Sequence, residues 1–115
     1  MWEIEFYELP GGRCPVENFL STLDERKDLP YIMNSLDSLA EFGYQLKRPH
    51  ADYLRDKIYE LRINTRNGQF RLLYFYDGNK IIITSGLKKK IRATSDHQID
   101  IAIGYRELYL KREKK

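Results

Sequence analysis

The chain of 115 residues has few of the side chains that small proteins use for cross-links and metal binding. Its single cysteine, Cys14, cannot form an internal disulfide, and with only two histidines, His50 and His97, we expect no structural metal site. No apolar run approaches the roughly 18 residues of a membrane span. The first residues, 1–5, are acidic where a secretory signal would be basic. We therefore expect a cytoplasmic protein that does not span a membrane.

Length and composition predict one domain over residues 1–115, because a hydrophobic fraction of 42% with nine Tyr and five Phe suffices for one core. Charge is divided unevenly along this domain. Residues 1–54 hold five basic and ten acidic side chains, whereas residues 55–115 hold fifteen basic and seven acidic ones. The second half is therefore the half that we expect to face a polyanion, although any single lysine more often only solvates the surface.

The first half of the sequence predicts one strand and two helices. Apolar and polar residues alternate over Trp2–Glu8, which is typical of a half-buried strand. Apolar residues at helical spacing then predict a helix from Pro15 to about Arg26 and a second helix from Pro30 to just before Gly43. Residues 44–53 have no clear periodicity and are interpreted as a loop.

The second half predicts an antiparallel three-stranded meander and a C-terminal helix, which makes the fold class α+β. The turn signals are Asn67-Gly68 and Asp77-Gly78-Asn79, and they separate strands over residues 54–66, 69–77 and 80–86. Ser95 and Gln98 have the spacing of a capping box at the start of a helix. The inward side of that helix is expected to carry Ile99, Ala102 and Ile103.

A two-residue turn at Asn67-Gly68 would pair Arg66 with Gln69 and so assign side chains to faces of the sheet. One face would carry Tyr59, Leu61, Ile63, Phe70, Leu72, Tyr74 and Tyr76 as a core surface beneath the helices. The other would bring Glu60, Arg62 and Arg71 together, with the two arginines as diagonal neighbours. An ordinary surface ion pair explains this arrangement about as well as a site does. The same face also carries Leu73 and Phe75, which suggests that it receives a nucleobase.

Three motifs carry a resemblance to a known family. They are Leu54-Arg55-Asp56-Lys57-Ile58-Tyr59-Glu60-Leu61-Arg62-Ile63, then Gln69-Phe70-Arg71-Leu72-Leu73-Tyr74-Phe75-Tyr76-Asp77-Gly78, and the lysine pair after the last strand. Together they resemble the RelE/HigB superfamily of toxins from type II toxin–antitoxin systems, specifically its phage-derived branch, over nearly the whole chain. That branch commonly has Phe before the lysine pair and Lys-Thr-Pro after it, whereas this chain has Leu87 before the pair and residues 91–95 read Ile-Arg-Ala-Thr-Ser.

The resemblance implies a RelE-like fold and an endoribonuclease, or mRNA interferase, that works without a cofactor. Such a toxin cleaves messenger RNA in the ribosomal decoding site by metal-independent attack of the 2′-hydroxyl and is silenced by a cognate antitoxin, often of helix-turn-helix type. By position the resemblance implies Arg62, Arg71 and Lys88 or Lys89 as the family's basic site residues, while some members have a basic residue at the position of Glu60. With Glu60 added from the sheet face, the expected catalytic residues are Glu60, Arg62, Arg71, Lys88 and Lys89. The further RNA contacts expected are Lys57, Phe75, Lys90 and Arg92.

Chemistry suggests roles for these side chains. Arg62 and Arg71 remain charged at neutral pH and bind phosphate oxygens, so they are expected to stabilise the charge that develops during cleavage. Glu60 is a candidate general base, although flanking arginines should lower its pKa and make it a weak one. The alternative bases are His97 and His50, each of which is more simply explained as an exposed histidine.

Two other functions stay open from the sequence. One is a ParE-like toxin, which inhibits DNA gyrase by binding it and hydrolyses nothing. The other is a plain nucleic-acid-binding module of phage type, for which the basic second half would suffice. Growth arrest on expression would separate a toxin from the binding module, and the mapping of messenger 5′ ends would separate cleavage from gyrase inhibition.

Overall fold

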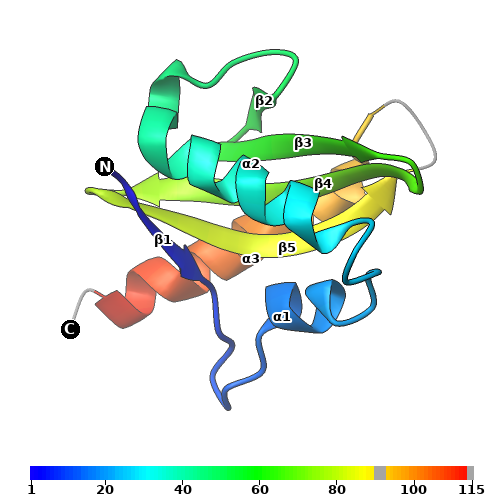
Figure 1. Cartoon of the computed structure of the whole chain (residues 1–115). Coiled ribbons are helices and arrows are strands. Elements are labelled where there is room, and N and C mark those ends of the chain that lie inside the picture. Colours follow the sequence, from blue (N-terminus) through cyan, green and yellow to red (C-terminus); the bar gives the residue numbers. More distant parts are fainter. Residues whose placement is uncertain (90–92, 114–115) are drawn as a thin grey trace.

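Five strands form one mixed sheet that has helices on both faces (Figure 1). The spatial order is β1-β5-β4-β3-β2, with β1 parallel to β5 and all other neighbours antiparallel. The strands are β1 (Glu3–Phe6), β2 (Ala51–Arg55), β3 (Ile58–Thr65), β4 (Gly68–Asp77) and β5 (Lys80–Lys89). The helices are α1 (Pro15–Leu20), α2 (Leu29–Phe42), a 3-10 turn η1 (Gly43–Gln45) and α3 (Asp96–Glu113). This computed structural model describes residues 1–89 and 93–113.

The α+β class and the order of an N-terminal strand, two helices, a meander and a C-terminal helix are confirmed. The first helix is shorter than predicted and ends at Leu20, because the hydroxyls of Ser21 and Thr22 donate to the carbonyls of its last turn. The predicted cap of α3 is confirmed, since the backbone amide of Gln98 donates to the Ser95 hydroxyl at 3.2 Å. Among the described residues, no helix is long and apolar enough to cross a membrane.

The meander has four strands instead of the predicted three. The segment 54–66 is interrupted by a tight turn at Asp56 and Lys57, whose φ angles of 51° and 72° are both in the left-handed region. Two consecutive positive φ angles give the turn geometry that suits the twist of a hairpin, so the chain folds back on itself at this point. The residues before the turn therefore form the edge strand β2, whose residues 51–53 were predicted to be a loop.

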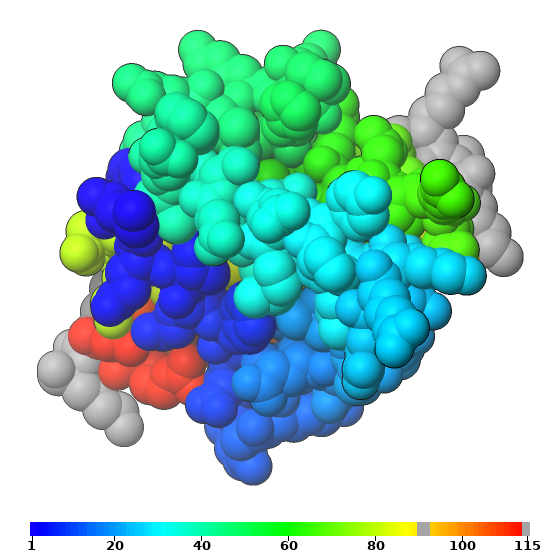
Figure 2. All heavy atoms as spheres, in the orientation of Figure 1, coloured from blue at the N-terminus to red at the C-terminus, as the bar shows by residue number. Residues whose placement is uncertain are grey.

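Each face of the sheet has its own core. Helices α1 and α2 cover one face, and Figure 2 shows that they and the segment after α2 hide most of the sheet from this side. Helix α3 packs on the other face and buries Ile58, Leu73 and Phe75 of the sheet against Ile99 and Ala102. The face predicted to be charged is therefore divided between a second core under α3 and a polar part beyond it.

A β-bulge in strand β5 decides which of its side chains reach each face. The pairing shifts between Leu73 and Tyr74 of β4, so that Thr84 has no partner residue in the ladder. The buried hydroxyl of Thr84 donates to the carbonyl of Leu73 at 3.1 Å. Beyond the bulge the alternation is reversed, which matters for the two lysines at the end of the strand.

Candidate functional site

Strands β3 and β4 bring the predicted acidic and basic side chains to one place. Arg62 pairs directly with Arg71, and Glu60 lies two residues along the same face of β3. The face assignment made from the sequence is therefore confirmed, although the register differs by two residues because Thr65 pairs with Gly68. A shift by two preserves the alternation of side chains, so no residue changes face.

The helical layer holds this register in place. The two residues at the turn are Arg66 and Asn67, and neither has a positive φ, while Gly68 takes a φ of 138°. The Asp28 carboxylate, just before α2, accepts hydrogen bonds from the Thr65 hydroxyl at 2.7 Å and from the Asn67 amide at 3.0 Å. These hydrogen bonds, that of Thr65 first, hold the pKa of Asp28 below its ordinary value. The turn is consequently tied to α2 at a position that the sequence pattern did not indicate.

Glu60 joins the two arginines. Its Oε2 accepts from Arg71 Nη1 at 2.6 Å and from Arg62 Nε at 2.8 Å, and its Oε1 accepts from the Thr94 hydroxyl. Glu60 is only 1% exposed and Arg71 only 3%, whereas the Arg62 side chain is 25% exposed. Of these three charged groups, Arg62 is therefore the one that a ligand can reach.

The edge strand β2 extends the ion pairs outward. Asp52 Oδ2 lies 3.1 Å from Arg62 Nη2 and 2.9 Å from Arg48 Nη2. The hydrogen bond from Arg48 is the main reason that the pKa of Asp52 is lowered. Positive and negative groups therefore alternate from the exposed loop before β2 to the buried centre of the sheet. We call this set the charged network: Arg48, Asp52, Arg62, Glu60 and Arg71.

Amide side chains complete the inner end of the charged network. Arg71 Nη2 donates to Gln69 Oε1 at 2.5 Å, and Gln69 Nε2 donates to Asn64 Oδ1 at 2.9 Å. Arg71 is thus held by both Glu60 and Gln69, which gives its guanidinium a single orientation. Sequence reasoning did not assign Asp52, Arg48, Gln69 or Thr94 to the site. Asp52 and Arg48 lay in a predicted loop, Gln69 was expected only to pair with Arg66 at the turn, and Thr94 belongs to no motif.

The protonation of Glu60 limits what it can do. Desolvation by burial raises the pKa of this carboxyl, but the hydrogen bonds from Arg71, Thr94 and Arg62 outweigh it and leave the pKa below its ordinary value. Glu60 is therefore ionised at neutral pH, and both of its oxygens are already occupied. Glu60 is therefore a weak base, and a substrate hydroxyl cannot easily reach it. Its position is better suited to orienting Arg62 than to abstracting a proton.

The two lysines predicted for the site lie on different faces. Lys88 pairs with Phe70 on the side of α1 and α2, and its ammonium lies 5.9 Å from the centre of the Phe70 ring. Lys89 pairs with Gln69 on the side of the charged network, and its ammonium donates to the carbonyl of Ala93. Lys88 and Arg62 therefore lie on opposite faces of the sheet, because the bulge at Thr84 reverses the alternation.

The residues expected to contact RNA also differ in accessibility. Phe75 is fully buried beneath α3, so it cannot stack on a base, and Leu73 beside it is buried in the same way. Lys57 is exposed in the turn between β2 and β3. The remaining two, Lys90 and Arg92, lie outside the described residues.

His50 lies closer to Arg62 than the sequence indicated. Its carbonyl accepts from the backbone amide of Arg62 at 2.8 Å, where β3 extends beyond the end of β2. The residues His50, Arg62 and Asn64 line one cleft of about 350 Å³ together with residues of α2. His50 and Arg62 therefore border the same cleft, whereas His97 is exposed in the first turn of α3.

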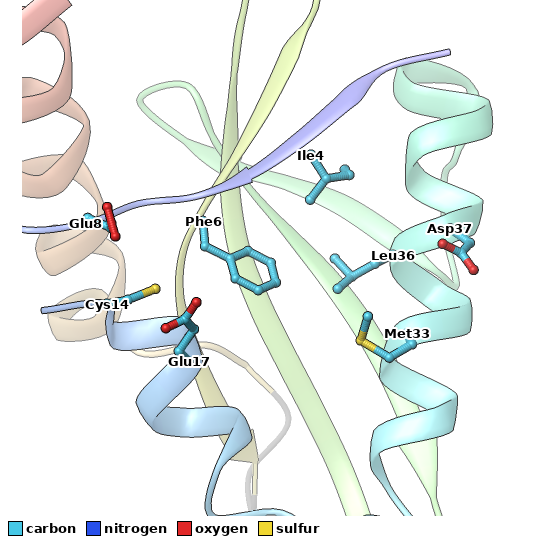
Figure 3. A pocket seen from close by; sticks show the side chains of 8 residues that line it. All are labelled: Ile4, Phe6, Glu8, Cys14, Glu17, Met33, Leu36 and Asp37. Atoms are coloured by element: carbon cyan, nitrogen blue, oxygen red, sulfur yellow. The ribbon is translucent and has the colours of Figure 1, made fainter. Parts of the chain in front are cut away.

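A second cleft, of about 430 Å³, lies between β1, α1 and α2, on the face of the sheet that these helices cover (Figure 3). Phe6, Met33 and Leu36 point toward one another across it and form an apolar floor. Its rim carries the carboxylates of Glu8, Glu17 and Asp37. No ion pair in the described part of the chain involves these three carboxylates. Its charge makes this cleft unsuitable for a phosphate backbone.

Comparison with known proteins agrees with the sequence motifs at the level of the family. The model of the phage-derived protein Gp49-like family (DUF891) matches residues 18–106, which include α2, the whole meander and more than half of α3. A search of curated proteins finds no significant match. The chain therefore belongs to the phage-derived Gp49-like family, a family associated with toxins of toxin–antitoxin modules.

Proposed function

We propose that the chain is the toxin of a type II toxin–antitoxin module and that it acts in the cytoplasm by cleaving messenger RNA on the ribosome. The observation that carries the proposal is Arg62, whose partly exposed guanidinium is held by two carboxylates and which borders the same cleft as His50. The mRNA substrate and the ribosomal setting follow the resemblance to the RelE/HigB superfamily.

Arg62 is proposed to bind the scissile phosphate. A guanidinium stays charged throughout the reaction and presents paired donors that match two phosphate oxygens. Its contacts with Glu60 and Asp52 fix its orientation before substrate arrives, so little reorganisation is needed as negative charge develops on phosphorus. Arg71, being buried, acts as a positioning residue that keeps Glu60 ionised.

His50 is proposed as the general base. A neutral imidazole takes a proton from the 2′-hydroxyl, whose oxygen then attacks the adjacent phosphorus, and the bond from phosphorus to the 5′-oxygen breaks. The products are a 2′,3′-cyclic phosphate and a 5′-hydroxyl, which receives its proton from solvent. Lys89, on the same face as Arg62, supplies further positive charge for the RNA backbone.

Cleavage is tested by adding the purified protein to translating ribosomes and mapping the 5′ ends of the messenger. We expect new ends that carry a 5′-hydroxyl, and we expect them to disappear with His50→Gln. Intact messenger together with growth arrest and inhibited gyrase would instead support the ParE-like function. Intact messenger without growth arrest would support the third function, a plain nucleic-acid-binding module.

The antitoxin is proposed to dock on the acidic cleft of Figure 3 and not over the charged network. Apolar side chains at its floor and three carboxylates at its rim suit an amphipathic segment that carries basic residues. Such docking leaves Arg62 uncovered and blocks the ribosomal site by bulk.

This docking is tested with the protein encoded beside the toxin, which we expect to be a small helix-turn-helix protein. The double substitution Glu17→Lys/Asp37→Lys should weaken its binding at least tenfold, because like charges then meet across the interface. Glu107→Lys/Glu113→Lys, which changes net charge equally on α3, should leave the affinity unchanged. A large loss with Arg62→Glu/Lys89→Glu and none with Glu17→Lys/Asp37→Lys would mean that the antitoxin covers the charged network.

A further inference from the structure

A third cleft lies at the edge strand β2 and is lined by two exposed tyrosines. It measures about 490 Å³ and is bounded by β2, by Tyr59 of β3 and by the segment that follows α2. Tyr44 and Tyr53 are 54% and 50% exposed, which is unusual for rings of this size. The residues that line it are Tyr44, Leu46, Lys47, Arg48, Ala51, Asp52, Tyr53 and Tyr59.

The three tyrosine rings form a rigid receptacle. The Tyr59 ring lies 5.0 Å from Tyr53 at an interplanar angle of 69° and 6.4 Å from Tyr44 at 66°. Behind them, Tyr44 stacks on Tyr76 with centroids 3.9 Å apart, and the Tyr53 hydroxyl accepts from the backbone amide of Lys57 at 3.1 Å. Their orientations are therefore set before any ligand binds, which reduces the entropic cost of stacking.

Cations surround these rings. Lys47 and Arg48 are exposed in the segment before β2, and Lys57 is exposed in the turn that holds Tyr53. Arg48 lines this cleft and also pairs with Asp52, whose carboxylate in turn binds Arg62. Two ion pairs thus lead around the edge strand β2 from this cleft, on the face of Tyr53 and Tyr59, to Arg62 on the opposite face.

We propose that this tyrosine cleft binds an unpaired nucleobase of single-stranded RNA whose backbone passes around the edge strand β2 to Arg62. A nucleobase stacks on an aromatic ring, and the phosphates on either side of it are attracted by the neighbouring lysine and arginine side chains. A protein segment would gain from the rings but not from the excess of cations, so the charge favours nucleic acid. The cleft then takes the role that the sequence assigned to Phe75.

This inference rests on the proposed function only in naming RNA as the ligand, and binding can be measured without cleavage. The probes are a fluorescein-labelled single strand of about six deoxyadenosines, which has no 2′-hydroxyl to attack, and an abasic strand of equal length and charge. Fluorescence anisotropy gives the affinity of each strand for the folded protein.

We expect the wild type to bind the base-bearing strand more tightly than the abasic one, and Tyr53→Leu to lower the affinity for the base-bearing strand roughly tenfold. The affinity for the abasic strand should not change with this variant. Tyr105→Leu is the matched control. It removes a ring of α3 that stacks on Tyr7, and we expect it to have no effect on binding. Tyr44→Leu gives a second, independent test of the same cleft.

Equal affinities of the wild type for the two strands, or no loss with either tyrosine variant of the cleft, would overturn the inference. An equal loss with Tyr105→Leu would do the same, because the effect would not be local. If wild-type protein cleaves messenger RNA but fails these binding tests, the inference about the tyrosine cleft is refuted and the proposed function stands. Protein that passes them without cleaving retains the cleft and refutes the proposed function.

Discussion

Replacing Arg71 by alanine should destabilise the protein strongly, although an arginine on a sheet face is ordinarily a mild site for substitution. The reason is that Glu60, 1% exposed, would lose its shortest ion pair, at 2.6 Å, in a place that water does not enter. Removing one partner of a buried ion pair costs about 3–5 kcal/mol, because the other charge stays buried without compensation. Glu60 keeps Arg62 and Thr94, so we expect a loss near the lower end, about 3 kcal/mol.

Urea unfolding followed by circular dichroism measures this loss as a change in the free energy of unfolding. Arg62→Ala is the matched control and should cost about 1–2 kcal/mol, because water can replace part of what this 25% exposed side chain provides. The double variant Glu60→Leu/Arg71→Met should recover most of the stability lost in Arg71→Ala. A loss below about 1 kcal/mol in Arg71→Ala would refute the buried ion pair as described.

Three further outcomes test other parts of the structure. Glu60 has a folded pKa below its unfolded value of about 4.3, so its stabilising effect is present above that pH and is lost as pH falls. The gap in unfolding free energy between wild type and Glu60→Gln should therefore narrow from about pH 5 towards pH 3, and a constant gap would contradict the lowered pKa. Leu61→Ala should cost about 2–5 kcal/mol in urea unfolding through a cavity on the α2 side, whereas near-wild-type stability would mean that β3 has slipped by one residue. Lys89→Glu should lower the salt dependence of ribosome binding by more than Lys88→Glu, with equal slopes counting against the bulge at Thr84.

The alternation of residues in the meander was enough to predict which side chains share a face. Glu60, Arg62 and Arg71 were placed together correctly even though the predicted register was two residues off. The register itself depends on Asp28, 37 residues before Thr65 in sequence, and a local pattern cannot contain such a contact. The general arrangement of the site was therefore predictable, while the direct pairing of the two arginines was not.

Other features depend on tertiary structure in the same way. The turn at Asp56 and Lys57 has no glycine or asparagine to mark it, so β2 and Asp52 were assigned to a loop. The bulge at Thr84 has no sequence signature, and it exchanges the faces of the sheet on which Lys88 and Lys89 lie. Phe75 alternates correctly with the charged side chains, but only the packing of α3 shows that it is buried.

The cleavage of a defined messenger by Arg62→Ala tests the central claim most directly. The messenger is bound to programmed ribosomes, and the single-turnover rate is compared for wild type, Arg62→Ala and the matched control Arg66→Ala, whose arginine is exposed at the tip of the same hairpin. We predict a roughly hundredfold to thousandfold slower rate for Arg62→Ala and a rate near that of wild type for Arg66→Ala. Equal rates for the two variants, with both folded, would contradict the proposal that the charged network holds Arg62 for catalysis.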